Sequence, residues 1–182
     1  MMKDNKANEN NENYQEYLRL KNDSDYLDVT FDEQSGGISA IHREHKFDKQ
    51  MGPFGCRRGD YEVVVISALR KNGYRVILES EKSQNNVKNS DGFINDIPME
   101  IKSVESDGVW SISSKMQEAE KQGAQVVILY FPEPTFYSKE RLLDGIGKYE
   151  SNPHIKSGRT ITSCLIVQGD QIVDHIKTTT TP

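Results

Sequence analysis

Cysteine pairs, long apolar runs and a secretion signal are all missing from this 182-residue sequence. Its two cysteines, Cys56 and Cys164, lie far apart and belong to no Cys-x-x-Cys pattern. This disfavours both a disulfide framework and a cysteine zinc site. No apolar run approaches the length of a membrane span, and the Asn- and Glu-rich start lacks the apolar core of a signal peptide. We therefore expect no membrane partner and a cytoplasmic site of action.

Apolar residues and excess positive charge are also scarce. Hydrophobic residues make up 35% of the chain, and the mean hydropathy is -0.72. Residues 1–35 hold four Lys and Arg against nine Asp and Glu, whereas residues 36–182 hold nineteen of each, so the acidity lies at the front. Bulk positive charge therefore gives no argument for nucleic-acid binding. Residues 41–75 carry eight basic and four acidic groups, an excess that suits either a phosphate backbone or an ordinary solvated face.

The length favours one domain with a core, preceded by a tail. Residues 1–13 have no apolar periodicity and are expected to be disordered, with a short helical turn between Tyr14 and Leu20. We therefore expect a disordered or weakly ordered acidic tail over residues 1–24 and a single domain over residues 25–178.

Strand and helix patterns alternate through the rest of the chain. Three helices are expected, at residues 59–72, 111–122 and 138–149. Strands are expected on both sides of Asn95-Asp96 and at residues 26–31, 37–41, 74–78, 125–131, 160–167 and 171–176. Helices interspersed with strands and hairpins indicate the α/β (α+β) class, with a mixed central β-sheet flanked by helices.

The stretch from Asp91 to Lys102 carries the pattern with the most chemical content. If Asn95-Asp96 closes a two-residue hairpin, Asp91 stands directly across from Glu100. Lys102 then lies on the same face, because side chains alternate along a strand. This placement depends on an even-length turn, since a shift of one residue would move Asp91 to the opposite face.

Two carboxylates facing each other at roughly 5 Å repel, and a cation between them removes the penalty. Carboxylate oxygens are ligands that magnesium takes, so we expect a divalent metal site, for Mg²⁺ with Mn²⁺ or Zn²⁺ as alternatives. Lys102 beside the metal could orient or deprotonate an attacking water, or balance charge that develops on a phosphate. The alternative is a surface hairpin whose exposed face happens to bear charges.

The candidate residues follow one another in a helix, hairpin, helix order: Glu62, Asp91, Glu100-x-Lys102, Gln117 and Gln122. This order resembles the PD-(D/E)XK nuclease superfamily, although Ser90 stands where the superfamily name has a proline. Over about residues 35–178, four motifs resemble more narrowly the C-terminal tRNA nuclease domain of contact-dependent growth-inhibition toxins: Gly36-Gly37-Ile38, His42-x-x-His45, Gly59-x-x-Glu62 and Gln122-Gly123-Ala124.

The resemblance implies a restriction-endonuclease-like core and a metal-dependent endonuclease that hydrolyses phosphodiester bonds. It implies that Glu62, Asp91 and Glu100 surround one or two divalent ions, with Lys102 beside the attacking water. It also implies tRNA rather than DNA as substrate, and a cognate immunity protein as partner. Glu62 has a second interpretation, because a carboxylate near a helix start complements the helix dipole without any catalytic role.

Basic and polar residues near these acids are candidates for gripping substrate phosphates. They are His42, Arg43, His45, Lys46, Arg57, Arg58 and Gln122. The alternative for all of them is a polar loop or a solvated helix face. Two rival functions also remain open: a DNA endonuclease of the same superfamily, and a non-catalytic protein of a mobile element that binds nucleic acid or a partner.

Overall fold

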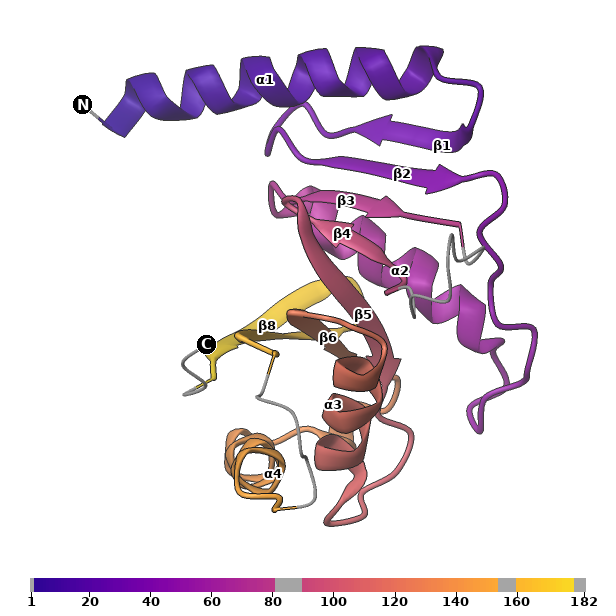
Figure 1. Ribbon diagram of the computed structural model, residues 1–182, viewed down its shortest axis with the longest axis vertical. Coiled ribbons are helices and arrows are strands. Elements are labelled where there is room, and N and C mark those ends of the chain that lie inside the picture. Colours follow the sequence, from indigo (N-terminus) through magenta and orange to yellow (C-terminus); the bar gives the residue numbers. More distant parts are fainter. Residues whose placement is uncertain (1, 81–89, 154–159, 179–182) are drawn as a thin grey trace.

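The computed structural model describes residues 2–80, 90–153 and 160–178 (Figure 1). These residues form one eight-stranded sheet, four α-helices and a short 3₁₀ helix at Pro134–Phe136. The sheet is mixed and helices flank it, so the predicted α/β class is confirmed. No helix in the described ranges combines the length and the apolar character needed to cross a bilayer.

The eight strands lie side by side in the order in which they occur along the chain. They are β1 (Tyr26–Phe31), β2 (Ile38–His42), β3 (Arg75–Leu78), β4 (Gly92–Ile94), β5 (Ile97–Ser103), β6 (Val126–Tyr130), β7 (Ser163–Gln168) and β8 (Gln171–Lys177). Three neighbouring pairs are parallel: β2 with β3, β5 with β6, and β6 with β7. A helix connects the strands of each parallel pair, as such crossovers require: α2 (Arg58–Lys71), α3 (Ser111–Lys121) and α4 (Lys139–Glu150).

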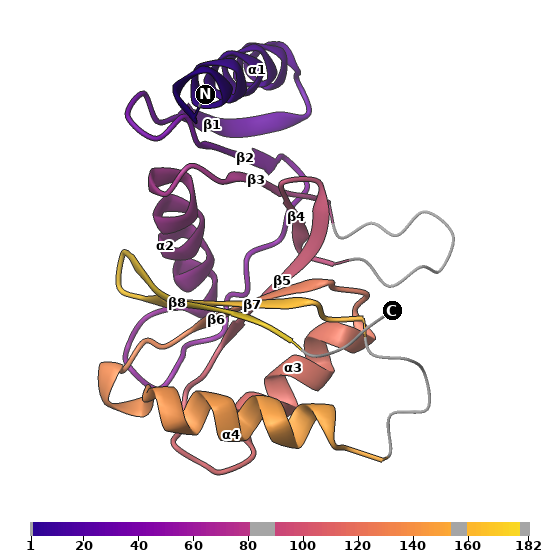
Figure 2. The same cartoon turned by 90° about the vertical axis from the view of Figure 1, so that its left-hand side faces the viewer.

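The helices cover both faces of the sheet. Side chains of β6 alternate between the two layers, with Ile128 in the cluster that α2 covers and Leu129 in the cluster that α3 and α4 cover. Figure 2 shows α2 on one side of β6 to β8, and α3 with α4 on the other. All of β6 is buried, which accounts for its uninterrupted apolar sequence.

The helix α1 (Met2–Asn22) begins the chain and packs against β1 and β2 (Figure 1), and it extends well beyond the short helical turn expected between Tyr14 and Leu20. The structure therefore differs from the expectation of no regular structure in residues 1–13. The buried side chain of Leu20 packs with Ile38, Ala40 and Ile77 on the sheet. These apolar contacts form only after folding, so periodicity within the tail gave no sign of them. The domain boundary after residue 24 stays a prediction.

The β4–β5 hairpin has the predicted register. Asn95 and Asp96 both have positive φ, 48° and 66°, as a two-residue type I′ turn requires. Phe93 then pairs with Pro98, and Gly92 with Met99. Gly92 packs tightly against β3, because a Cβ there would lie 1.9 Å from the carbonyl oxygen of Ile77. This register places Asp91 across from Glu100 on β5.

Replacing Leu20 with alanine should destabilise the protein by about 2–5 kcal/mol, because the change removes buried methyl groups that hold α1 on the sheet. Leu143→Ala on α4 is the matched control, since Leu143 is 49% exposed and should cost less than about 1 kcal/mol. Urea unfolding measures both. Equal losses in the two variants would contradict the packing of α1.

Candidate active site

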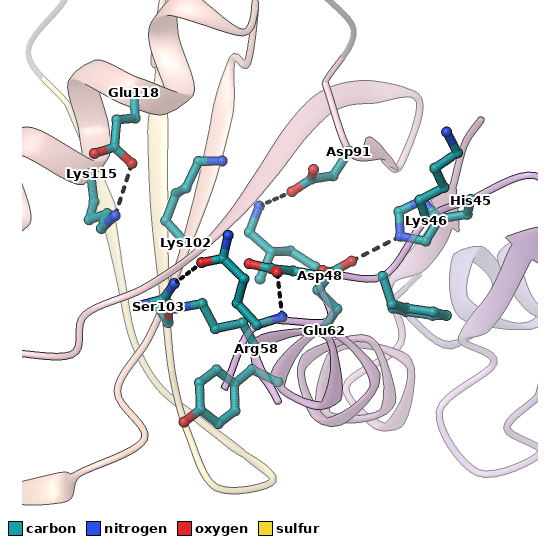
Figure 3. Close-up of a pocket in the computed structure, with 14 residues that line it drawn as sticks. His45, Lys46, Asp48, Arg58, Glu62, Asp91, Lys102, Ser103, Lys115 and Glu118 are labelled. Atoms are coloured by element: carbon teal, nitrogen blue, oxygen red, sulfur yellow. Dashed lines mark hydrogen bonds and ion pairs between the residues drawn. The ribbon is translucent and has the colours of Figure 1, made fainter. Parts of the chain in front are cut away.

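The carboxylates of Asp91 and Glu100 each accept a hydrogen bond from a backbone N–H across the hairpin. The backbone N–H of Asp91 donates to Oε1 of Glu100 at 2.8 Å. The backbone N–H of Ile101 donates to Oδ2 of Asp91, also at 2.8 Å, and this bond is the dashed line drawn at Asp91 in Figure 3. Each carboxylate is thus fixed by the opposite strand, and the two acids lie together at the end of the hairpin, as the sequence predicted.

Glu100 is fully buried, with 0% exposure, so the interpretation of an exposed charged face on a surface hairpin is wrong. Its Oε2 lies 2.5 Å from Nζ of Lys102, whose side chain is 16% exposed. Among the described residues Oε2 has no partner with the angles of a regular hydrogen bond, so this contact is an ion pair. Met99 and Ile101, which alternate with these residues, enter the core on the other face of β5.

The surroundings change the proton affinities of both side chains. Burial, and then the charge of Asp91, raise the pKa of Glu100 to about 8, although Lys102 opposes the shift. Burial lowers the pKa of Lys102, but the charges of Glu100 and Asp91 outweigh it and leave that pKa above its usual value. Lys102 therefore stays positively charged at neutral pH.

Glu62 reaches the same place from α2. It is the fifth residue of the helix rather than a member of the first turn, where Asp60 is the acidic residue. Dipole complementation at the helix start therefore does not explain Glu62. Its Oε2 lies 2.9 Å from Nε2 of His45. Burial, and then Asp91, raise the pKa of Glu62 against the opposing effect of His45.

A cavity of about 600 Å³ is lined by Asp91, Lys102, Glu62 and His45 (Figure 3). The predicted residues in its wall are His45, Lys46, Arg58, Glu62, Asp91 and Lys102. Glu100 is too deeply buried to form part of the surface of the cavity. The hairpin, α2, α3 and the loop after β2 all contribute, so segments far apart in the sequence meet here.

Sequence reasoning missed several residues of this wall. They include Asp48, Gln50, Tyr61, Ser103, Lys115 and Glu118. Lys115 and Glu118 stand three apart on α3 and form an ion pair at 2.9 Å, a spacing that is visible in the sequence. Gln117, between them, instead donates to Ser113 on the same helix at 3.1 Å.

Arg58 lies in the wall, but its guanidinium is already engaged. It makes a bidentate pair with Glu105, with N–O distances of 2.7–3.0 Å, and also donates to Gln50 at 2.9 Å. Burial raises the pKa of Glu105, but the hydrogen bonds from the guanidinium and the nearby positive charge outweigh burial and hold that pKa below its usual value. Sequence reasoning missed Glu105, the partner that limits how freely Arg58 can grip a phosphate.

The four other substrate-binding candidates do not line this cavity. The ring of His42 lies edge-on to Tyr26, and Arg43 is exposed to solvent. Arg57 stands at the N-terminal cap of α2 and lines a neighbouring cavity with His45. Gln122 is the C-terminal cap of α3.

The donor set fits a divalent cation in part. Within residues 2–80, 90–153 and 160–178, no group of three or more His, Cys, Asp and Glu side chains is arranged to hold a metal ion. The paired carboxylates of Asp91 and Glu100 are nevertheless oxygen donors of the right kind, and Oε2 of Glu100 is a buried acceptor whose contact in the described part of the chain is the ion pair with Lys102. Glu62 can complete the set only through its second oxygen, because His45 occupies Oε2.

In EDTA, the wild-type protein should lose stability as the pH rises from 5 to 8, and Glu100→Gln should lose less. The folded-state pKa of Glu100, about 8, lies above the unfolded value, so its contribution is fully present below about pH 4.5 and is lost as the pH rises. The raised pKa values of Glu62 and His45 act in the same direction in both proteins. We expect a difference on the order of 1–3 kcal/mol.

Urea unfolding at a series of pH values measures this difference. Glu118→Gln is the control, because it makes the same chemical change on a side chain that is 49% exposed. Parallel pH curves for the wild type and Glu100→Gln would contradict the high pKa of Glu100.

No protein-family model matches the sequence, and no curated protein and no solved structure match it either. The resemblance to PD-(D/E)XK nucleases therefore rests on the residues quoted above and stays a prediction.

Proposed function

We propose that the protein is a metal-dependent endonuclease that hydrolyses phosphodiester bonds. The observation that carries this proposal is the carboxylate pair of half-buried Asp91 and buried Glu100, with Lys102 held beside it at the wall of a cavity of about 600 Å³. A buried acid with a raised pKa, such as Glu100, is costly to keep for stability alone. Such groups in a cleft are typical of functional sites.

Asp91 and Glu100 would hold the divalent cation, and Glu62 would approach it through the oxygen that His45 leaves free. A bound divalent cation supplies activation of water and stabilisation of negative charge on a phosphate. Lys102 is charged because it pairs with Glu100, so balancing charge on the phosphate in the transition state suits it better than abstracting a proton.

The cavity suits a charged substrate. Lys46 lines it together with Lys102 and brings positive charge to the acidic centre from a further segment of the chain, whereas Lys115, also in the wall, is paired with Glu118. A phosphodiester backbone needs this combination, with cations to position phosphates and carboxylates to hold the metal.

We further propose tRNA as the substrate and a toxin role with a cognate immunity protein, acting in the cytoplasm. The resemblance to growth-inhibition toxin domains supports these three proposals, and the geometry of the cavity is neutral between RNA and DNA.

Lys102→Ala and Asp91→Ala should each reduce cleavage of total tRNA by at least about 100-fold while leaving the fold intact, because each removes a charge from the reacting centre. Lys121→Ala, at the exposed end of α3, is the control and should cleave like the wild type. The assay uses purified protein with Mg²⁺, Mn²⁺, Zn²⁺ or EDTA, and circular dichroism checks the fold. Equal cleavage by the wild type and Lys102→Ala would rule out this mechanism.

The same assay run on plasmid DNA separates the rival functions. Cleavage of plasmid with intact tRNA would assign the protein as a DNA endonuclease. Binding of tRNA in EDTA without cleavage in any of the three metals would assign it as a non-catalytic binding protein.

A further inference from the structure

A chain of hydrogen bonds runs from the hairpin to the acid on α2. The backbone N–H of Glu79, just after β3, donates to the carbonyl oxygen of Asp91 at 2.9 Å. The carbonyl oxygen of Glu79 lies 2.8 Å from Nδ1 of His45. Nε2 of the same ring lies 2.9 Å from Oε2 of Glu62, the contact drawn in Figure 3. Glu79 and His45 thus connect Asp91 to Glu62.

The chemistry of this chain assigns the two ring nitrogens of His45. A carbonyl oxygen only accepts hydrogen bonds, so Nδ1 must carry the hydrogen that Glu79 receives. Nε2 is then committed to Glu62. Both nitrogens are in use, and neither is left to donate to a substrate phosphate. His45 lines the cavity, but the phosphate-gripping role expected from its sequence motif does not suit it.

The ring is also held firmly in place. Its side chain is only 2% exposed, and Phe47 packs edge-on against it with ring centroids 4.9 Å apart. Phe47 belongs to a loop that packs tightly on α2, since a Cβ at Gly59 would lie 2.6 Å from the Cβ of Phe47. Glu79 is anchored in turn, because its carboxylate accepts a hydrogen bond from the hydroxyl of Tyr26 at 2.8 Å.

We propose that His45 is a positioning residue for Glu62. A glutamate has several rotatable bonds, and holding it in one conformation costs side-chain entropy. The fixed ring of His45 selects one orientation of the carboxylate, in which Oε2 is bound to the ring and Glu62 faces the cavity that Asp91 also lines. Residues that orient metal ligands in this way typically change metal affinity or activity by about 10–100-fold when replaced.

The kinetic consequence rests on the proposed nuclease function, and the test uses two matched variants of His45. The amide of asparagine can take the place of Nδ1, and the amide of glutamine that of Nε2. His45→Gln therefore keeps a donor for Glu62, whereas His45→Asn keeps one only for Glu79. We expect His45→Asn to lower the cleavage rate about 10–100-fold, and His45→Gln to recover at least half of that loss on a logarithmic scale.

A double-mutant cycle separates positioning from a general structural effect. If His45 acts through Glu62, adding His45→Asn to Glu62→Ala should lower the rate no further than Glu62→Ala alone. His175→Asn, which changes an exposed histidine on β8, is the control and should behave like the wild type. Two outcomes would overturn the positioning role and leave the nuclease proposal standing. One is a double variant whose loss of cleavage rate is the sum of the two single losses on a logarithmic scale, and the other is a His45→Asn variant that cleaves as fast as an active wild type.

A second measurement does not depend on cleavage. Titration calorimetry of Mn²⁺ binding without nucleic acid should give a roughly 10-fold or greater loss of affinity in His45→Asn, and no further loss when Glu62→Ala is already present. If the wild type cleaves nothing, the nuclease proposal fails and this titration still decides the role of His45. Equal Mn²⁺ affinity in the wild type and His45→Asn, or no Mn²⁺ binding by the wild type, would overturn it.

Discussion

The backbone hydrogen bonds that hold the Asp91 and Glu100 carboxylates across the hairpin are the interaction on which the site depends. Two carboxylates at facing strand positions repel, yet here each accepts a backbone N–H from the opposite strand at 2.8 Å. The bonds hold the two acids in a fixed relation before any ligand arrives. They require the register set by Asn95 and Asp96, so the geometry of a turn controls the electrostatics of the cavity.

Burial gives this arrangement its chemical character. Glu100 has no access to water, and it responds by holding its proton to about pH 8. Lys102, whose Nζ lies 2.5 Å from Oε2, lowers the pKa of Glu100 but offsets only part of the effect of burial and of Asp91. A divalent cation that binds both carboxylates would supply the missing charge. Glu62 and His45 extend the same arrangement to α2, so hairpin and helix share one electrostatic centre.

Local patterns predicted the parts of the fold and site that depend on neighbouring residues. The turn at Asn95-Asp96 gave the register, alternation placed Lys102 on the face of Glu100, and Gly73 marked the end of α2. Features made by distant segments could not be read in this way. The burial of Glu100 depends on the helices around the sheet, and the pairing of Arg58 with Glu105 joins residues 47 positions apart. The two bonds of His45 likewise exist only in the folded chain.

Anomalous diffraction from crystals soaked in Mn²⁺ can show whether a divalent cation binds at the Asp91–Glu100 pair. We expect an anomalous peak within coordination distance of both carboxylates, about 2.0–2.4 Å from their oxygens. The peak should disappear in crystals of Asp91→Ala. A well-ordered wild-type crystal with no peak at this pair, or with its only peak elsewhere, would contradict this expectation.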